Sequence, residues 1–91
     1  MKLKNRAEMM EWLSKHMYFV ETTEKFNGSF GGIWLSAENT EVYSGIPMYD
    51  YYSENYELYD LGVYTKWEEK LNSMGWYSEW HDPGTVMLWE M

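Results

Sequence analysis

Carboxylates and phenol rings alternate in the middle of the chain. The carboxylates are Asp50, Glu54, Glu57 and Asp60, and the tyrosines around them are Tyr49, Tyr51, Tyr52, Tyr56 and Tyr59. Two carboxyl groups can hydrolyse a glycosidic bond when they flank a cleft at a separation of about 5–9 Å. A chain of 91 residues has little room for a deep cleft. We therefore expect these nine residues to form a binding surface.

The other residues that could carry chemistry form no catalytic or metal-binding pattern. His81 and Asp82 are neighbours, but adjacent strand residues point to opposite faces, and Asp82 suits a turn. His16 falls on the apolar stripe of an expected helix, where histidine more often fills space than reacts. Cysteine is absent, as are nucleophile, phosphate-loop and EF-hand motifs. The sequence predicts no enzyme, no cofactor and no metal site.

Charge is distributed unevenly along the chain. The formal net charge is −8, and the forty residues from Phe26 to Thr65 hold six acids, seven tyrosines and no lysine or arginine. Nucleic-acid binders need cations along the phosphates, so direct binding to DNA or RNA is not expected. Anionic membranes are disfavoured for the same reason. An acidic surface of this kind attracts a basic protein instead.

These features predict that the chain binds, and inhibits, a basic protein. Carboxylates at intervals along a surface imitate a run of phosphates, and tyrosines between them supply contact area at low entropic cost. In composition and size the chain is similar to small acidic proteins of phages and mobile elements, which act as DNA mimics. The expected partner is a basic protein of the nucleic-acid-binding kind.

Two alternatives stay open. Exposed tryptophan or tyrosine rings could bind a carbohydrate or another small ligand. Alternatively, the chain is an accessory protein whose acidic charge only maintains solubility, and many of the tyrosines pack the loop onto the sheet.

Length and composition predict one domain over residues 1–91. Aromatic residues make up 20% of the chain, including six tryptophans, and each can bury about 150–250 Å². No apolar run approaches the ~20 residues of a membrane span, and Glu8 and Glu11 interrupt the basic N-terminal segment, unlike a signal peptide. We expect a cytoplasmic monomer or small homo-oligomer.

Two helices are expected from the apolar periodicity. Asn5 and Glu8 have the spacing of a capping box ahead of a helix over about residues 6–17. Thr65 and Glu68 repeat this spacing at the start of a second helix, and Gly75 is its expected left-handed stop. The apolar stripe of the second helix comprises Tyr64, Trp67, Leu71 and Met74.

Strands are expected on both sides of Asn27-Gly28, the strongest signal for a two-residue hairpin. They cover residues 18–26 and 29–36, and a two-residue loop would pair Val20 with Leu35.

A turn at 38–40 leads to a third strand over 41–46, which Pro47 ends. The segment 47–60 has no regular period and predicts an ordered loop with a short helical turn.

A final hairpin covers residues 76–81 and 85–89, with its turn at Asp82-Pro83-Gly84. A two-residue loop would pair Trp80 with Met87 and a three-residue loop would pair it with Val86, so the buried face of the last strand stays open. The order α-β-β-β-α-β-β predicts an α+β fold, with two helices on one face of an antiparallel sheet.

Overall fold

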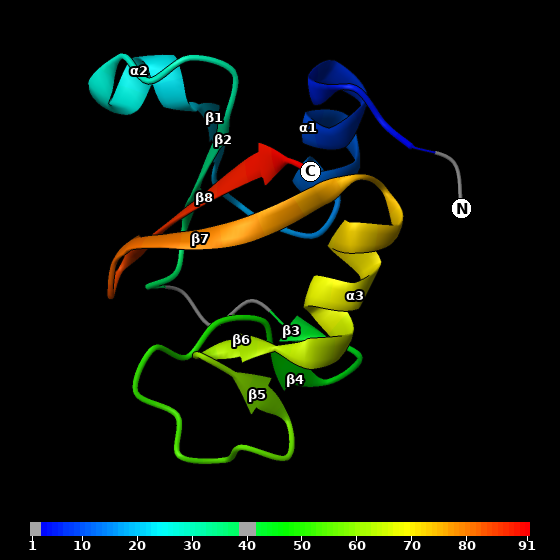
Figure 1. Ribbon diagram of the computed structural model, residues 1–91, viewed down its shortest axis with the longest axis vertical. Helices are drawn as coiled ribbons and strands as arrows, with labels where there is room; N and C mark the ends of the chain where they lie inside the picture. The colour runs from blue at the N-terminus through cyan, green and yellow to red at the C-terminus, as the bar shows by residue number, and fades with distance from the viewer. Residues whose placement is uncertain (1–2, 39–41) are drawn as a thin grey trace.

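A four-stranded antiparallel sheet with strand order β1-β2-β8-β7 organises the computed structural model, which describes residues 3–38 and 42–91 (Figure 1). The helices are α1 (Arg6–Ser14), α2 (Thr23–Asn27) and α3 (Thr65–Ser73). The sheet contains β1 (Val20–Thr22), β2 (Ile33–Ser36), β7 (Trp76–Asp82) and β8 (Thr85–Glu90). Two small hairpins are formed by β3 (Val42–Tyr43) with β4 (Ile46–Pro47) and by β5 (Tyr59–Asp60) with β6 (Val63–Tyr64). The predicted α+β class is confirmed.

Helix α1 begins at the predicted capping box. Asn5 Oδ1 accepts the Glu8 N–H at 2.9 Å, and Glu8 Oε1 accepts the Asn5 N–H at 3.0 Å. The helix ends at Ser14, earlier than predicted, but the Met17 N–H still bonds the Leu13 carbonyl at 2.9 Å. The apolar face therefore continues through one further turn. None of the helices in the described part of the chain is long and apolar enough to cross a membrane.

The pairing of β1 with β2 has the predicted register, but the connection between them was predicted wrongly. Val20 is opposite Leu35, yet the two-residue hairpin is replaced by the short helix α2, which ends at Gly28 with φ 82°. A helix C-cap and a type I′ turn both need positive φ, so Asn27-Gly28 suits either. The local signal was read correctly as a positive-φ site and assigned to the wrong structure.

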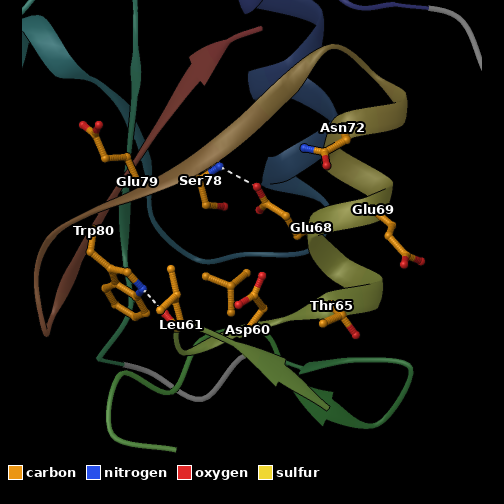
Figure 2. A pocket seen from close by; sticks show the side chains of 10 residues that line it. Asp60, Leu61, Thr65, Glu68, Glu69, Asn72, Ser78, Glu79 and Trp80 are labelled. Atoms are coloured by element: carbon orange, nitrogen blue, oxygen red, sulfur yellow. Dashed lines mark hydrogen bonds between the residues drawn. The ribbon is translucent and has the colours of Figure 1, made fainter. Parts of the chain in front are cut away.

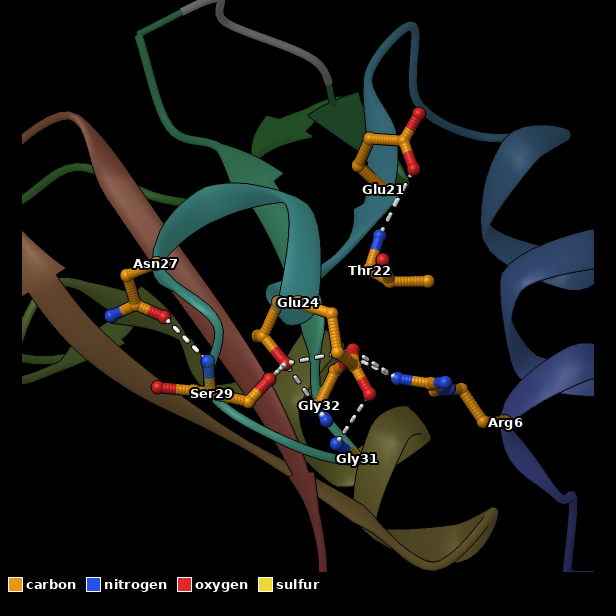
Figure 3. A network of polar contacts seen from close by, with 9 residues as sticks. Arg6, Glu21, Thr22, Glu24, Asn27, Ser29, Gly31 and Gly32 are labelled. Carbon is orange, nitrogen blue, oxygen red and sulfur yellow. Dashed lines mark hydrogen bonds and ion pairs between the residues drawn. The ribbon is translucent and has the colours of Figure 1, made fainter.

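A polar network ties α1 to the segment between α2 and β2 (Figure 3). Arg6 Nη1 donates to Glu24 Oε1 at 2.7 Å and to the Gly32 carbonyl at 3.1 Å. The Gly31 N–H donates to Glu24 Oε2 at 3.0 Å. The hydrogen bond from Arg6, followed by that from Gly31, lowers the pKa of Glu24 from 4.5 to about 2.

Strand β8 lies inside the sheet and is covered on both faces. Leu88 contributes to the core that α1 and α3 share, while Met87 is paired with Trp34 on the other face. There Phe19 and Phe26 pack against Trp34 with ring centroids 4.6 and 4.8 Å away. The question of which residue is buried is thus answered: both are, at 4% exposed for Met87 and 0% for Leu88.

The C-terminal hairpin combines the two alternatives that its sequence allows. Trp80 pairs with Val86, as a three-residue loop would require, but Asp82 pairs with Thr85 around a two-residue turn. A β-bulge between Trp80 and Asp82 supplies the extra residue. Asp82 is the predicted turn former, since its Oδ1 accepts the Gly84 N–H at 2.9 Å.

The predicted third strand is wrong as a member of the sheet. Residues 42–47 form the separate β3–β4 hairpin, because Ser44 and Gly45, at φ 53° and 80°, reverse the chain there. Pro47 lies within β4 and does not end a strand, which is tolerated where its missing N–H faces no partner. Residues 39–41, which include most of the predicted turn, lie outside the described residues.

Helix α3 has the predicted apolar stripe and stop but not the predicted capping box. Thr65 is the first helical residue, and the N-cap, Tyr64, makes no side-chain cap bond. Glu68 Oε2 instead accepts the Ser78 N–H of β7 at 3.0 Å. Gly75 has φ 93°, as expected of a left-handed stop. The four stripe residues Tyr64, Trp67, Leu71 and Met74 are all buried.

The Arg6–Glu24 ion pair predicts a specific loss of acid stability. Because its folded pKa of about 2 lies below 4.5, the stabilisation from Glu24 is complete above pH 4.5 and is lost as pH falls through 2. Glu24→Gln should lower the melting temperature at neutral pH and flatten its fall within that window. Glu11→Gln, an exposed change on α1, is the control and should do neither. Thermal unfolding followed by circular dichroism at a series of pH values measures both, and identical acid limbs for Glu24→Gln and wild type would refute the assignment.

Candidate functional site

The predicted irregular segment is confirmed as a loop. We call residues 48–58, between β4 and β5, the tyrosine loop. Its conformation is held by local bonds, among them Ser53 N–H to the Asp50 carbonyl at 3.0 Å and Tyr59 N–H to the Asn55 carbonyl at 3.0 Å. Asn55 Oδ1 also accepts the Glu57 N–H at 3.2 Å. The loop is therefore ordered, with a hydrogen-bonded turn before β5.

Two of the five predicted tyrosines lie in the core. Tyr49 is 6% exposed, and its hydroxyl accepts the Trp67 indole N–H at 2.9 Å and bonds Ser78 Oγ at 2.9 Å. Burial raises the pKa of Tyr49 well above its ordinary value. Tyr59 is 7% exposed and donates to the Pro47 carbonyl at 2.7 Å, and burial again raises its pKa. These two residues anchor the ends of the tyrosine loop.

The other predicted site residues face solvent. Tyr51, Tyr52 and Tyr56 are 46%, 76% and 80% exposed, and the Tyr51 and Tyr52 rings meet edge to face with centroids 5.1 Å apart. All four predicted carboxylates, Asp50, Glu54, Glu57 and Asp60, are exposed. The structure therefore presents three phenol rings and four acids on one short stretch of chain.

A tight turn between β5 and β6 supports the tyrosine loop from below. Leu61 and Gly62 both have positive φ, 51° and 79°, as a type I′ turn requires. The Asp50 N–H bonds the Gly62 carbonyl at 2.8 Å. A Cβ on Gly62 would stand 2.9 Å from the Asp50 carbonyl oxygen and 2.9 Å from Tyr51 Cα. Only glycine allows the loop to lie this close.

Trp80 of β7 forms a wall beside the tyrosine loop. Its indole N–H donates to the Leu61 carbonyl at 2.7 Å. Its ring meets Tyr51 edge to face at a centroid distance of 5.0 Å and Tyr49 at 5.7 Å. One hydrogen bond and two ring contacts hold the half-buried indole in place.

Two cavities meet at this wall. The first, of about 850 Å³, is open and lies along the tyrosine loop, where Tyr51 and Tyr56 line it. The second, of about 500 Å³, lies between α3 and β7 (Figure 2). They share Asp60, Leu61 and Trp80 in their walls, and no lysine or arginine lines either of them. The acidic surface thus continues into a recess that the sequence did not indicate.

The histidines take no part in this region. His16 is exposed and its ring lies 4.4 Å from that of Trp12, while His81 meets Phe26 edge to face at 4.8 Å. Across the described residues, no group of three or more His, Cys, Asp or Glu side chains could hold a metal ion.

Sequence reasoning missed Leu61, Glu68 and Trp80 as members of the site. Leu61-Gly62 between two short β-prone pairs was an available hairpin signal, but nothing local places Trp80 beside it. Comparison with protein-family models, curated proteins and solved structures finds no match. The functional argument therefore depends on this geometry.

The two type I′ turns offer a matched test of the loop support. Gly62→Ala and Gly45→Ala both place alanine at positive φ, at 79° and 80°, which costs about 1–2 kcal/mol. Only Gly62→Ala adds a clash, because a Cβ on Gly45 meets nothing within 4 Å. We expect Gly62→Ala to lose about 1–3 kcal/mol more free energy of unfolding, measured by urea denaturation. Equal losses would contradict the close packing.

The buried hydroxyl of Tyr49 predicts a second difference. Tyr49→Phe leaves the Trp67 indole N–H without its acceptor, which should lower the free energy of unfolding by about 1–3 kcal/mol. Tyr52→Phe removes an exposed hydroxyl and should change it by less than about 0.5 kcal/mol. Denaturant unfolding of both variants provides the measurement, and a Tyr49→Phe variant as stable as Tyr52→Phe would show that the bond contributes nothing.

Proposed function

We propose that this protein binds, and thereby inhibits, a basic protein through the tyrosine loop and Asp60. The observation that carries the proposal is the exposure of three tyrosines and four carboxylates on a loop anchored by two buried tyrosines. No lysine or arginine occurs between Phe26 and Thr65 to neutralise them.

Ordering of the loop favours tight association. Tyr49 and Tyr59 already hold both of its ends, so a partner need not pay the full entropy of ordering it. Exposed tyrosines are efficient contact residues because they add large area with few rotatable bonds. The acids would steer a basic partner during the encounter. Inhibition follows where the covered surface is the one with which the partner binds nucleic acid.

Carbohydrate binding has weaker support. All six tryptophans belong to the described part of the chain, and none is exposed: Trp67 and Trp76 are fully buried and the others are half-buried. A sugar would have to stack on the tyrosines of the loop. A glycan panel that shifts the resonances of those tyrosines would favour this function over ours.

Matched charge variants test the proposal. Asp50→Asn/Glu54→Gln/Glu57→Gln removes three charges from the tyrosine loop. The control Glu11→Gln/Glu38→Gln/Glu90→Gln removes three exposed charges elsewhere. A partner is first captured from host lysate on the immobilised wild-type protein at low salt, released by high salt and purified. Its association rate with each variant is then measured by surface plasmon resonance across a salt series.

Electrostatic steering predicts different results for the two triple variants. The loop variant should associate about tenfold more slowly at low salt and lose most of its salt dependence, while the control keeps both within about a factor of two. Equal effects would mean that only net charge matters. Failure to capture any salt-released basic protein would favour the solubility function.

A further inference from the structure

The cavity between α3 and β7 has the walls of a site for an elongated cation. Glu68 extends from α3 toward Ser78, and Asp60 rises from its floor beside Leu61 (Figure 2). Its volume of about 500 Å³ falls within the range of small-ligand sites, roughly 300–1,000 Å³. Carboxylates at the end and apolar atoms along the side suit a chain that is aliphatic along its length and charged at its tip.

Glu68 has unused capacity to accept hydrogen bonds. Its Oε2 accepts the Ser78 N–H at 3.0 Å, whereas its Oε1 is buried with no hydrogen-bond partner. Among the described residues, no other buried side-chain nitrogen or oxygen atom lacks one. An unmet buried acceptor is costly, more so when it is charged. A donor entering the cavity would remove that cost.

The arrangement excludes a metal ion as the natural occupant. No three acids in the described chain are close enough to share one, and the Glu69 side chain is directed away from β7 (Figure 2). A guanidinium group is larger than a metal ion and carries five N–H donors in a planar fork. It can bond carboxylates that do not converge on one point.

Trp80 supplies the second feature that a guanidinium prefers. Its ring lines the cavity and is held by the 2.7 Å bond to the Leu61 carbonyl. Guanidinium groups stack on aromatic faces and are less strongly hydrated than ammonium groups. Arginine therefore fits this wall better than lysine.

We infer that this cavity binds one arginine side chain of the basic partner, with Glu68 and Asp60 as its carboxylate partners and Trp80 as its aromatic wall. The inference deepens the proposed function and rests on it for the source of the arginine. Because the cavity shares Asp60, Leu61 and Trp80 with the recess along the tyrosine loop, one partner surface can reach both.

The test uses small probes and needs no partner. N-acetyl-arginine amide is titrated into the ¹⁵N-labelled protein, and the Ser78 amide and Trp80 indole resonances are followed by NMR. We expect saturable shifts with a dissociation constant on the order of millimolar. N-acetyl-citrulline amide, its neutral isostere, should bind at least about tenfold more weakly, and N-acetyl-lysine amide should also bind more weakly. Absence of saturable shifts, or equal binding of any two probes, would overturn the inference.

Two neighbouring variants form a matched pair. In Glu68→Gln the amide oxygen can still accept the Ser78 N–H while an NH₂ group replaces Oε1, so arginine amide should bind about tenfold more weakly. Glu69→Gln removes the same charge from the adjacent residue and should bind within about twofold of wild type. If Glu68→Gln does not fold, Asp60→Asn replaces it and should weaken binding by at least about threefold. Equal affinities for wild type and the cavity variant, or equal losses in both members of the pair, would refute the site.

Failure of this inference can be told apart from failure of the proposed function. Arginine amide that does not bind, in a protein whose tyrosine-loop variant still slows partner association, removes the cavity and keeps the function. Arginine amide that binds, with no effect of the loop variant on the partner, does the reverse.

Discussion

A hydrogen bond between two buried aromatic residues, Trp67 and Tyr49, joins the tyrosine loop to the rest of the fold. The Trp67 indole donates to the Tyr49 hydroxyl, which is also bonded to Ser78. These residues come from α3, the start of the loop and β7. The Trp67 ring in addition stacks on Trp12 of α1 at a centroid distance of 5.6 Å. Four segments far apart in the chain thus meet at one side chain. Because each polar atom there has a partner, the cluster can be fully buried without a desolvation penalty.

This anchoring explains how a charged, aromatic stretch remains ordered. Tyr49 and Tyr59 are buried at its two ends, so the residues between them can face solvent without lengthening a free loop. Glu68 has a comparable double role. Its bond to the Ser78 N–H covers the free edge of β7, and exposed strand edges otherwise invite aggregation. The same side chain presents an unused oxygen at the adjoining cavity. Stability and the proposed recognition therefore share their residues on this side of the molecule.

Local signals predicted local structure well. The Asn5–Glu8 capping box, the Gly75 stop and the opposition of Val20 to Leu35 depend on neighbouring residues or on the period of a strand, and all are confirmed. Predictions were wrong where one local signal suits two structures. Asn27-Gly28 indicated positive φ, which serves the end of α2 as well as a hairpin. The third strand left the sheet because β8, from the other end of the chain, occupies the place beside β2.

For the site, the sequence alone determined the sign of the surface and its chemistry, because a window with acids and tyrosines and no base is negative however it folds. Tertiary structure decided which tyrosines face outward. Tyr49 and Tyr51 are both tyrosines of one segment, yet one is 6% and the other 46% exposed. The difference arises from Trp67 and Trp80, which lie more than a dozen positions further along the chain. Burial is a property of contacts between distant segments, so composition and spacing could not distinguish anchor from surface.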